Sequence, residues 1–232
     1  MTLPFVSQFA VAPVLANDID TTVIDQKSAH LALRVNFLPV LASISKTKNR
    51  PLTDYQWVSV EALQVQWLMG WFKRWFCHRD TILVKGGHEP EYFAATDTEP
   101  AKIVFAHGFF ASALHEISHW CMAGQKRRLL NDFGYWYAPD GRNEQQQQQF
   151  EQVEILPQAI ECLLTLACNK PFSVSKDNLF ADFDTSQSTF EADVQAQAVK
   201  FWQTGQKLST DAKVLLSQLT KLRPLPLTSF DI

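Results

Sequence analysis

The feature that most constrains this chain is an H-E-x-x-H string that runs from His115 to His119. Residues four apart in sequence lie one above the other on the same face of an α-helix. On a helix, His115 and His119 can therefore offer two imidazole nitrogens to one metal ion. Glu116 would lie beside them, within reach of a water bound to that ion. The alternative is a pair of core histidines that only share a helix face, but the rarity of the string favours a metal site.

The segment around this string is predicted to be helical. It has no proline or glycine from Phe109 to Ala123, and Gly124 follows directly. Glycine is common just past the last residue of a helix. We therefore expect a helix over residues 109–123 that carries both histidines and ends at Gly124.

Composition limits the class of protein. The chain has 232 residues, of which 46% are hydrophobic and 19% charged, as expected for one globular domain or a domain with a small appendage. A net charge of −3 gives no reason to expect nucleic acid as a partner. We expect no membrane contact and a cytoplasmic location, because no apolar run is long enough to span a bilayer. The opening residues also lack the basic start of a signal peptide, and Pro4 and Pro13 interrupt them.

The cysteines do not suggest a disulfide framework. No C-x-x-C pair occurs, and two of the cysteines lie in apolar segments that are predicted to be helical, so buried free thiols are expected. The four are Cys77, Cys121, Cys162 and Cys168.

The pattern before the H-E-x-x-H string predicts a helix and a small sheet. Residues 59–77 are expected to form a helix, with an aromatic core face at every fourth residue. Three short stretches rich in β-branched and aromatic residues are expected to be strands. The aromatic face comprises Leu63, Trp67, Trp71 and Trp75, and the strands are residues 81–85, 91–95 and 102–106.

Helices dominate the prediction for the rest of the chain. After a basic run at residues 126–128 and an aromatic loop at 132–142, a helix is expected over residues 150–164, with Pro157 in its first turn or at a kink. The polar run at residues 145–149 is expected to be solvated. Two more helices are expected, over 188–203 and 210–221. The predicted fold class is therefore α+β, a mainly helical, zincin-like domain with a small sheet preceding the H-E-x-x-H helix. We expect it to occupy residues 56–232, after an N-terminal extension of residues 1–55.

Two histidines hold a metal weakly, so a third protein ligand is expected. The later apolar helix offers three carboxylates, Glu151, Glu154 and Glu161. Glu154 is preferred because it lies at the entry of the helix beside Pro157, and Glu151 is the reserve. Both could instead be exposed carboxylates that the helix dipole favours near an N-terminus.

Two chemistries fit these ligands. With zinc, Glu116 would act as general base on a bound water in peptide hydrolysis. With Fe(II), two histidines and Glu154 would leave positions open for dioxygen, and the reaction would be a hydroxylation. The H-x-D string at residues 78–80 is a less promising metal-binding motif, because the sequence gives it no well-spaced distal histidine.

Four blocks of the sequence closely resemble the bacterial elongation factor P hydroxylases, and the likeness covers the chain from about Val60 to Gln203. This resemblance implies hydroxylation of a lysine of elongation factor P after a lysyl group has been attached to it. It further implies a metallopeptidase fold used as an oxygenase, with His115, His119 and Glu154 as ligands. The expected metal is Fe(II), with zinc as the alternative. The blocks are I-V-F-A-H-G-F-F-A-S-A-L-H-E-I-S-H-W-C, D-F-G-Y-W-Y-A-P-D-G-R, F-E-Q-V-E-I-L-P-Q-A and P-F-S-V-S-K-D-N-L.

Such a substrate suggests roles for further residues. A lysyl-lysine carries ammonium groups, which carboxylates and aromatic faces bind. An acidic protein substrate would suit the basic run at residues 126–128. His107 lies at the junction before the metal helix, where its side chain could reach the site. The carboxylate candidates are Glu116, Asp140 and Glu151, and the aromatic candidates are Tyr135, Trp136 and Tyr137.

Overall fold

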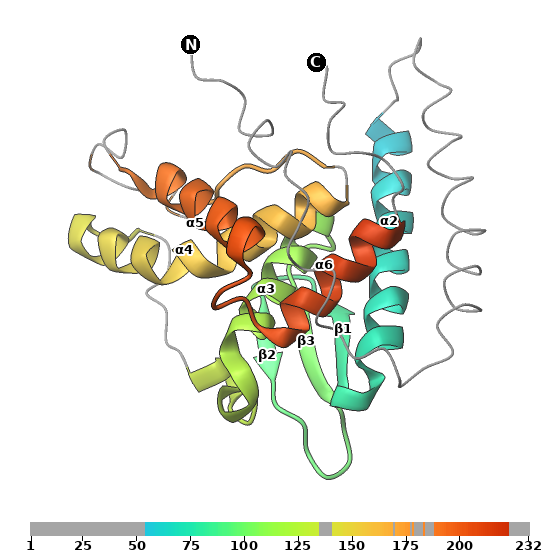
Figure 1. Cartoon of the computed structure of the whole chain (residues 1–232). Coiled ribbons are helices and arrows are strands. Elements are labelled where there is room, and N and C mark those ends of the chain that lie inside the picture. Colours follow the sequence, from blue (N-terminus) through green and yellow to red (C-terminus); the bar gives the residue numbers. More distant parts are fainter. Residues whose placement is uncertain are drawn as a thin grey trace. The chain divides into compact units, whose positions relative to one another are not determined.

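The computed structural model describes residues 54–134, 141–168, 170–176, 178, 183 and 188–222. The predicted N-terminal extension lies outside these residues, apart from Asp54 and Tyr55 at the start of the first helix. The described elements are α2 (Asp54–Phe76), η3 (Cys77–Arg79), β1 (Thr81–Lys85), β2 (Glu91–Phe93), β3 (Ala101–Phe105), α3 (Phe110–Arg127), η4 (Asn131–Gly134), α4 (Glu144–Ala167), α5 (Phe190–Thr204) and α6 (Thr210–Leu222) (Figure 1). This confirms the predicted α+β class, mainly helical with a small sheet before the H-E-x-x-H helix.

The chain divides into two compact units, one within residues 18–113 and the other mainly residues 114–232. The first unit holds a three-stranded sheet in the order β1-β3-β2. Central β3 pairs in parallel with β1, Thr81 opposite Ala101, and antiparallel with β2, Tyr92 opposite Ile103. Alternate residues of β3 are buried, as expected for a sheet with one face in the core.

Helix α2 packs on β1, but its buried face differs from the predicted one. Leu63 is 50% exposed, and Trp67 and Trp75 are only partly buried. A spacing of four drifts around a helix with 3.6 residues per turn, whereas alternating spacings of three and four stay on one face. The buried stripe mixes spacings of three and four and comprises Val65, Leu68, Trp71, Phe72 and Phe76.

A sharp turn joins β3 to α3. His107 and Gly108 have φ angles of 54° and 74°, and a side chain at Gly108 would also overlap that of Lys85. Glycine fits this position because it adopts positive φ without steric cost. The first N–H groups of an α-helix have no intrahelical acceptor, and the N–H of Phe110 donates to the Glu61 carboxylate of α2 at 3.0 Å. The turn and this contact fix where α3 begins.

Helix α3 breaks where the sequence predicted its end. Gly124 has φ 68° and ψ 172°, which interrupts the helical path before the last residues of the element. The structure therefore agrees with the expectation of a helix ending at Gly124, since only glycine adopts this conformation readily.

Helix α4 begins earlier than predicted. Asn143 accepts a hydrogen bond from the N–H of Gln146, whose side chain bonds back to the Asn143 N–H, forming a capping box. The polar run at residues 145–149 therefore forms the first turns of the helix and exposes every member except Gln147. Pro157 lies inside α4.

Helices α5 and α6 both pack against α4, and their bounds lie within two residues of the predicted ones. In Figure 1, α4 and α5 lie side by side. The buried residues of α5 recur at spacings of three and four, which is the pattern of one helix face. They are Phe190, Val194, Ala198, Phe201 and Trp202. Among the helices that the structure describes, none combines the length and the apolar character needed to cross a membrane.

Candidate metal centre

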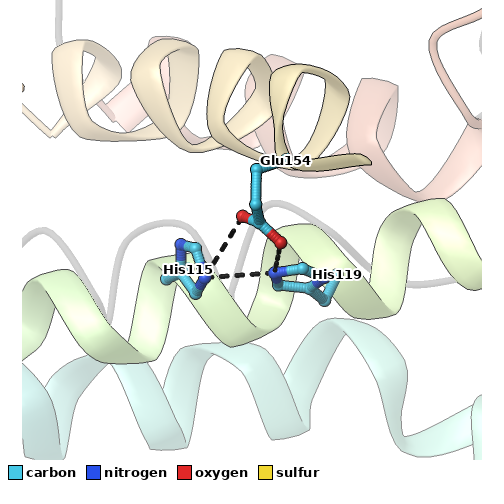
Figure 2. Close-up of side chains that lie close together, drawn as sticks. All are labelled: His115, His119 and Glu154. Atoms are coloured by element: carbon cyan, nitrogen blue, oxygen red, sulfur yellow. Dashed lines mark hydrogen bonds and ion pairs between the residues drawn. The ribbon is translucent and has the colours of Figure 1, made fainter. Parts of the chain in front are cut away.

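Helix α3 presents the two histidines of the H-E-x-x-H string on one face, as their spacing predicts. The Nε2 atoms of His115 and His119 lie 3.0 Å apart, and the ring centroids are 4.7 Å apart (Figure 2). Both side chains are mostly buried, with 25% and 13% of their surface exposed. The two nitrogens therefore point to one place.

Helix α4 brings Glu154 to the same place, as Figure 2 shows. One carboxylate oxygen, Oε1, lies 3.3 Å from His119 Nε2, and the other, Oε2, lies 3.7 Å from His115 Nε2. The Glu154 side chain is 2% exposed. A buried carboxylate is costly without partners of opposite charge, and this one faces two imidazoles.

These three side chains fit a divalent metal ion. Their ligand atoms all lie within 4.8 Å of one another. Two atoms bound at about 2.1 Å from one ion, at right angles to each other, lie about 3.0 Å apart. The three observed separations, from 3.0 to 3.7 Å, are close to that value. Two imidazole nitrogens and a carboxylate oxygen suit iron(II) and zinc alike.

A second carboxylate of α4 supports the cluster from its other side. Glu161 Oε2 lies 2.8 Å from His115 Nδ1, the ring nitrogen that faces away from Glu154. Sequence reasoning named Glu161 only as one of three possible ligands. Its place seven residues after Glu154, on the same helix face, was the signal that could have identified it.

Gln158 holds Glu154 in place and was missed by the sequence analysis. It is fully buried, and its Nε2 donates to Glu154 Oε2 at 3.4 Å and to the Ser175 carbonyl at 2.8 Å. Its Oε1 accepts from the Ser175 N–H at 3.0 Å. The spacing of four residues between Glu154 and Gln158 places both on one face of α4.

The electrostatics of the cluster favour a bound positive charge. Burial lowers the pKa of His115, but a hydrogen bond to Glu161 and the charges of nearby carboxylates outweigh burial and raise it to about 10. A nitrogen that holds a proton this tightly lies in strongly negative surroundings. A metal cation would satisfy them equally well. The carboxylates responsible are Glu161, Glu116 and Glu154.

Glu154 is ionised at neutral pH. Burial raises the pKa of this carboxyl, but the charge of His119, hydrogen bonds from His119 and Gln158, and the charge of His115 together lower it to about 2. Metal ligation requires a carboxylate in this ionised form. Glu154 therefore meets that requirement.

Glu116 lies beside the cluster in a different electrostatic state. It is partly buried, and burial raises its pKa, while His115 and His119 oppose the rise. A carboxyl with a raised pKa holds a proton more readily than an exposed carboxyl does, so it can take up and pass on a proton. That behaviour suits the proton-carrying role expected of Glu116.

Two other candidate residues have different surroundings. Glu151, the reserve ligand, accepts hydrogen bonds from Gln147 at 3.2 Å and Ser188 at 2.7 Å. It joins α4 to the start of α5 and is not in the group that could hold a metal. His107 is exposed, with its ring 5.9 Å from that of Phe109. The candidates Tyr135, Trp136, Tyr137 and Asp140 lie outside the described residues.

The basic run at the end of α3 is less available than expected for a docking surface. Arg128 lies 3.5 Å from the centroid of the Trp120 ring and pairs with Asp211 at 2.7 Å. Arg127 donates to the carbonyl of Phe133 at 3.0 Å. Lys126 is exposed. Two of the three cations therefore make contacts that stabilise the fold. In a freely solvated run of charges, the side chains would make no such contacts.

The fold and the cluster define a class of chain in which two histidines of an H-E-x-x-H helix and a carboxylate of a later helix converge on one place. Residues 71–226 match the family described as elongation factor P hydroxylase. A protein of Haemophilus influenzae, elongation factor P lysine hydroxylase, is 43% identical over 156 residues, which are 66% of this chain and 87% of that protein. The chain belongs to the elongation factor P hydroxylase family and is an enzyme of the hydroxylase class. The likeness noted in the sequence is thus confirmed.

Proposed function

We propose that this chain hydroxylates the lysyl-modified lysine of elongation factor P with dioxygen at a metal centre. The metal is a divalent ion, Fe(II) in our proposal, held by His115, His119 and Glu154. The observation that carries this proposal is the convergence of three ligand atoms from two helices on one place. The name of the H. influenzae relative supports elongation factor P as the substrate.

The three ligands would leave coordination positions open. Iron bound there would supply the chemistry that activates dioxygen, which protein side chains cannot do alone. In the overall reaction one oxygen atom enters a C–H bond of the substrate. The second leaves as water and consumes two electrons and two protons from an external reductant.

The remaining residues would bind the substrate and handle protons. Glu116 would hold a proton beside the ligands, because its pKa is raised by burial. The ammonium groups of the modified lysine suit carboxylates and aromatic rings. The substrate-binding residues in this proposal are His107, Tyr135, Trp136, Tyr137, Asp140 and Glu151. We also keep residues 56–232 as the hydroxylase domain and residues 1–55 as an extension.

The test is the mass of the substrate. The purified chain is incubated with Fe(II), a chemical reductant and lysylated elongation factor P, with and without dioxygen. The mass of the substrate is then measured by mass spectrometry. We expect a gain of one oxygen atom that requires dioxygen and the lysyl group. His115→Ala, His119→Ala and Glu154→Ala should each abolish it. His88→Ala, an exposed histidine between β1 and β2, is the matched control and should hydroxylate as the parent does.

Peptide hydrolysis is the outcome that would contradict this proposal. A zinc peptidase would cleave a peptide bond without dioxygen, and the cleavage would depend on Glu116 as general base. An unchanged substrate mass together with a Glu116-dependent cleavage product would assign the ligands to hydrolysis.

A further inference from the structure

His115 is held at both of its ring nitrogens by carboxylates from one helix. Nδ1 lies 2.8 Å from Glu161 Oε2, and Nε2 lies 3.7 Å from Glu154 Oε2. Glu154 and Glu161 are seven residues apart on α4, which is two helical turns, so both project from the same face. The imidazole lies between them.

A carboxylate at Nδ1 determines what Nε2 can do. An ionised carboxylate only accepts hydrogen bonds, so Nδ1 must carry the hydrogen in the contact with Glu161. A metal ion that binds His115 displaces one proton, and the neutral imidazole that remains carries its hydrogen on Nδ1 and a lone pair on Nε2. That lone pair lies on the side of Glu154 and His119. Without Glu161 the hydrogen could move to Nε2 and block the position.

We infer that Glu161 is a positioning residue that fixes the tautomer and the ring orientation of His115 for metal binding. This inference rests on the proposed function, because it concerns the same metal centre. Glu161 would act through His115, since the group of possible ligands contains Glu154 and not Glu161. Groups that orient a ligating histidine in this way contribute about 10- to 100-fold in metal affinity.

The burial of Glu161 supports this role. Only 7% of the residue is exposed, its charge acts on the Glu116 carboxyl, and it shares His115 with Glu154. A third buried carboxylate raises the electrostatic cost of the cluster unless a cation is bound there. If Glu161 had only a structural role, its ion pair with His115 would be sufficient. That role would not require the His115 ring to present Nε2 to Glu154.

The test compares metal affinity in the full chain, two Glu161 variants and one control variant. Glu161→Ala removes the acceptor. Glu161→Gln keeps the shape and one acceptor oxygen but can also donate to Nδ1, so it no longer enforces a single tautomer of His115. Glu144→Gln, an exposed carboxylate in the first turn of α4, makes the same change of charge on the same helix and is the control. Cobalt(II) binding is measured by competition with a chelator, and the visible spectrum of the bound cobalt reports its ligands.

We expect the cobalt affinity to fall about 10- to 100-fold in Glu161→Ala, with a smaller fall in Glu161→Gln and none in Glu144→Gln. The cobalt spectrum should change in both Glu161 variants, while circular dichroism shows that they are folded. If Glu161→Ala does not fold, Glu161→Gln decides the question. Parental affinity and spectrum in Glu161→Gln would overturn the inference and leave the metal centre intact. A parent chain that binds no cobalt would overturn the metal centre itself.

Discussion

Arg128 illustrates how a residue of a basic run can be part of the core. Its guanidinium lies over the Trp120 ring, its Nε donates to the Trp120 carbonyl at 2.9 Å, and its Nη1 pairs with Asp211 of α6. Both side chains of the ion pair are only 11% exposed. The pair therefore joins the end of α3 to α6 in surroundings that screen charge weakly.

We predict that Arg128→Ala lowers the free energy of unfolding by about 3–5 kcal/mol, because it removes the cation that pairs with the mostly buried Asp211 carboxylate. The measurement is urea unfolding followed by circular dichroism. Lys126→Ala, at an exposed position of the same run, should change the free energy by no more than about 0.5 kcal/mol. Equal effects of the two substitutions would show that the Arg128 pair is solvated.

A second prediction at the residue scale concerns Gln158, which links Glu154 to the backbone of Ser175. Gln158→Leu keeps most of the volume but removes the hydrogen bonds to Glu154 and to the N–H and carbonyl of Ser175, each worth about 0.5–1.5 kcal/mol. We expect lower stability in urea and weaker cobalt binding. Gln152→Leu, at an exposed position of α4, should leave both unchanged. Parental cobalt affinity in Gln158→Leu would mean that Glu154 needs no support from this amide.

At this scale the sequence predicts part of the centre. His115 and His119 follow from a four-residue spacing that any helix turns into a shared face. The choice among the carboxylates of α4 does not, because it depends on which face of α4 meets α3. Glu151 bonds to Ser188, whereas Glu161 meets His115. Only the packing of the two helices distinguishes them.

At the scale of elements, the start of α4 shows how a local signal overrides composition. A run of glutamines carries no apolar helical pattern, so the sequence predicted a solvated run and a helix that begins only at residue 150. The capping box at Asn143 instead satisfies the first backbone N–H groups and lets the helix begin at Glu144. The polar side chains then form its exposed face.

We predict that Asn143→Ala lowers the free energy of unfolding by about 1 kcal/mol, since it removes the acceptor for the Gln146 N–H. Asn143→Asp restores an acceptor and should recover most of the loss. The measurement is the urea midpoint of each variant. A loss that Asn143→Asp does not recover would point to a different role for this side chain.

Strand and helix positions were otherwise predictable to within a few residues, because alternation and helical spacing mark them directly. The core face of α2 was not. Trp67 and Trp75 were expected on the buried face of α2, but the residues at spacings of three and four are the ones that pack inward. Large apolar side chains alone do not define the buried face.

At the scale of the whole molecule, metal binding is coupled to stability. The ligands come from α3 and α4, so an ion binds the folded chain and not the unfolded one. At a free metal concentration 100 times the dissociation constant, the folded state gains about 2.7 kcal/mol. For a chain of this size we therefore predict a rise in Tm of roughly 5–10 °C.

Scanning calorimetry with and without zinc measures this shift. His119→Ala removes one ligand and should abolish it, whereas His88→Ala should retain it. A metal-dependent rise in Tm that persists in His119→Ala would place the binding site elsewhere on the chain.

The domain proposal can be tested at the same scale. The family match begins at residue 71, and α2 begins at Asp54. We predict that a chain starting at Leu52 keeps the zinc-dependent rise in Tm and the hydroxylation of elongation factor P. Loss of both in a folded protein would show that residues 1–51 belong to the enzyme domain.

The most direct test of the central claim is an anomalous difference map from crystals grown with Fe(II), with data collected on both sides of the iron absorption edge. We predict one strong peak, bounded by the Nε2 atoms of His115 and His119 and by the Glu154 carboxylate. The absence of a peak there, or a peak coordinated by other residues, would contradict the account.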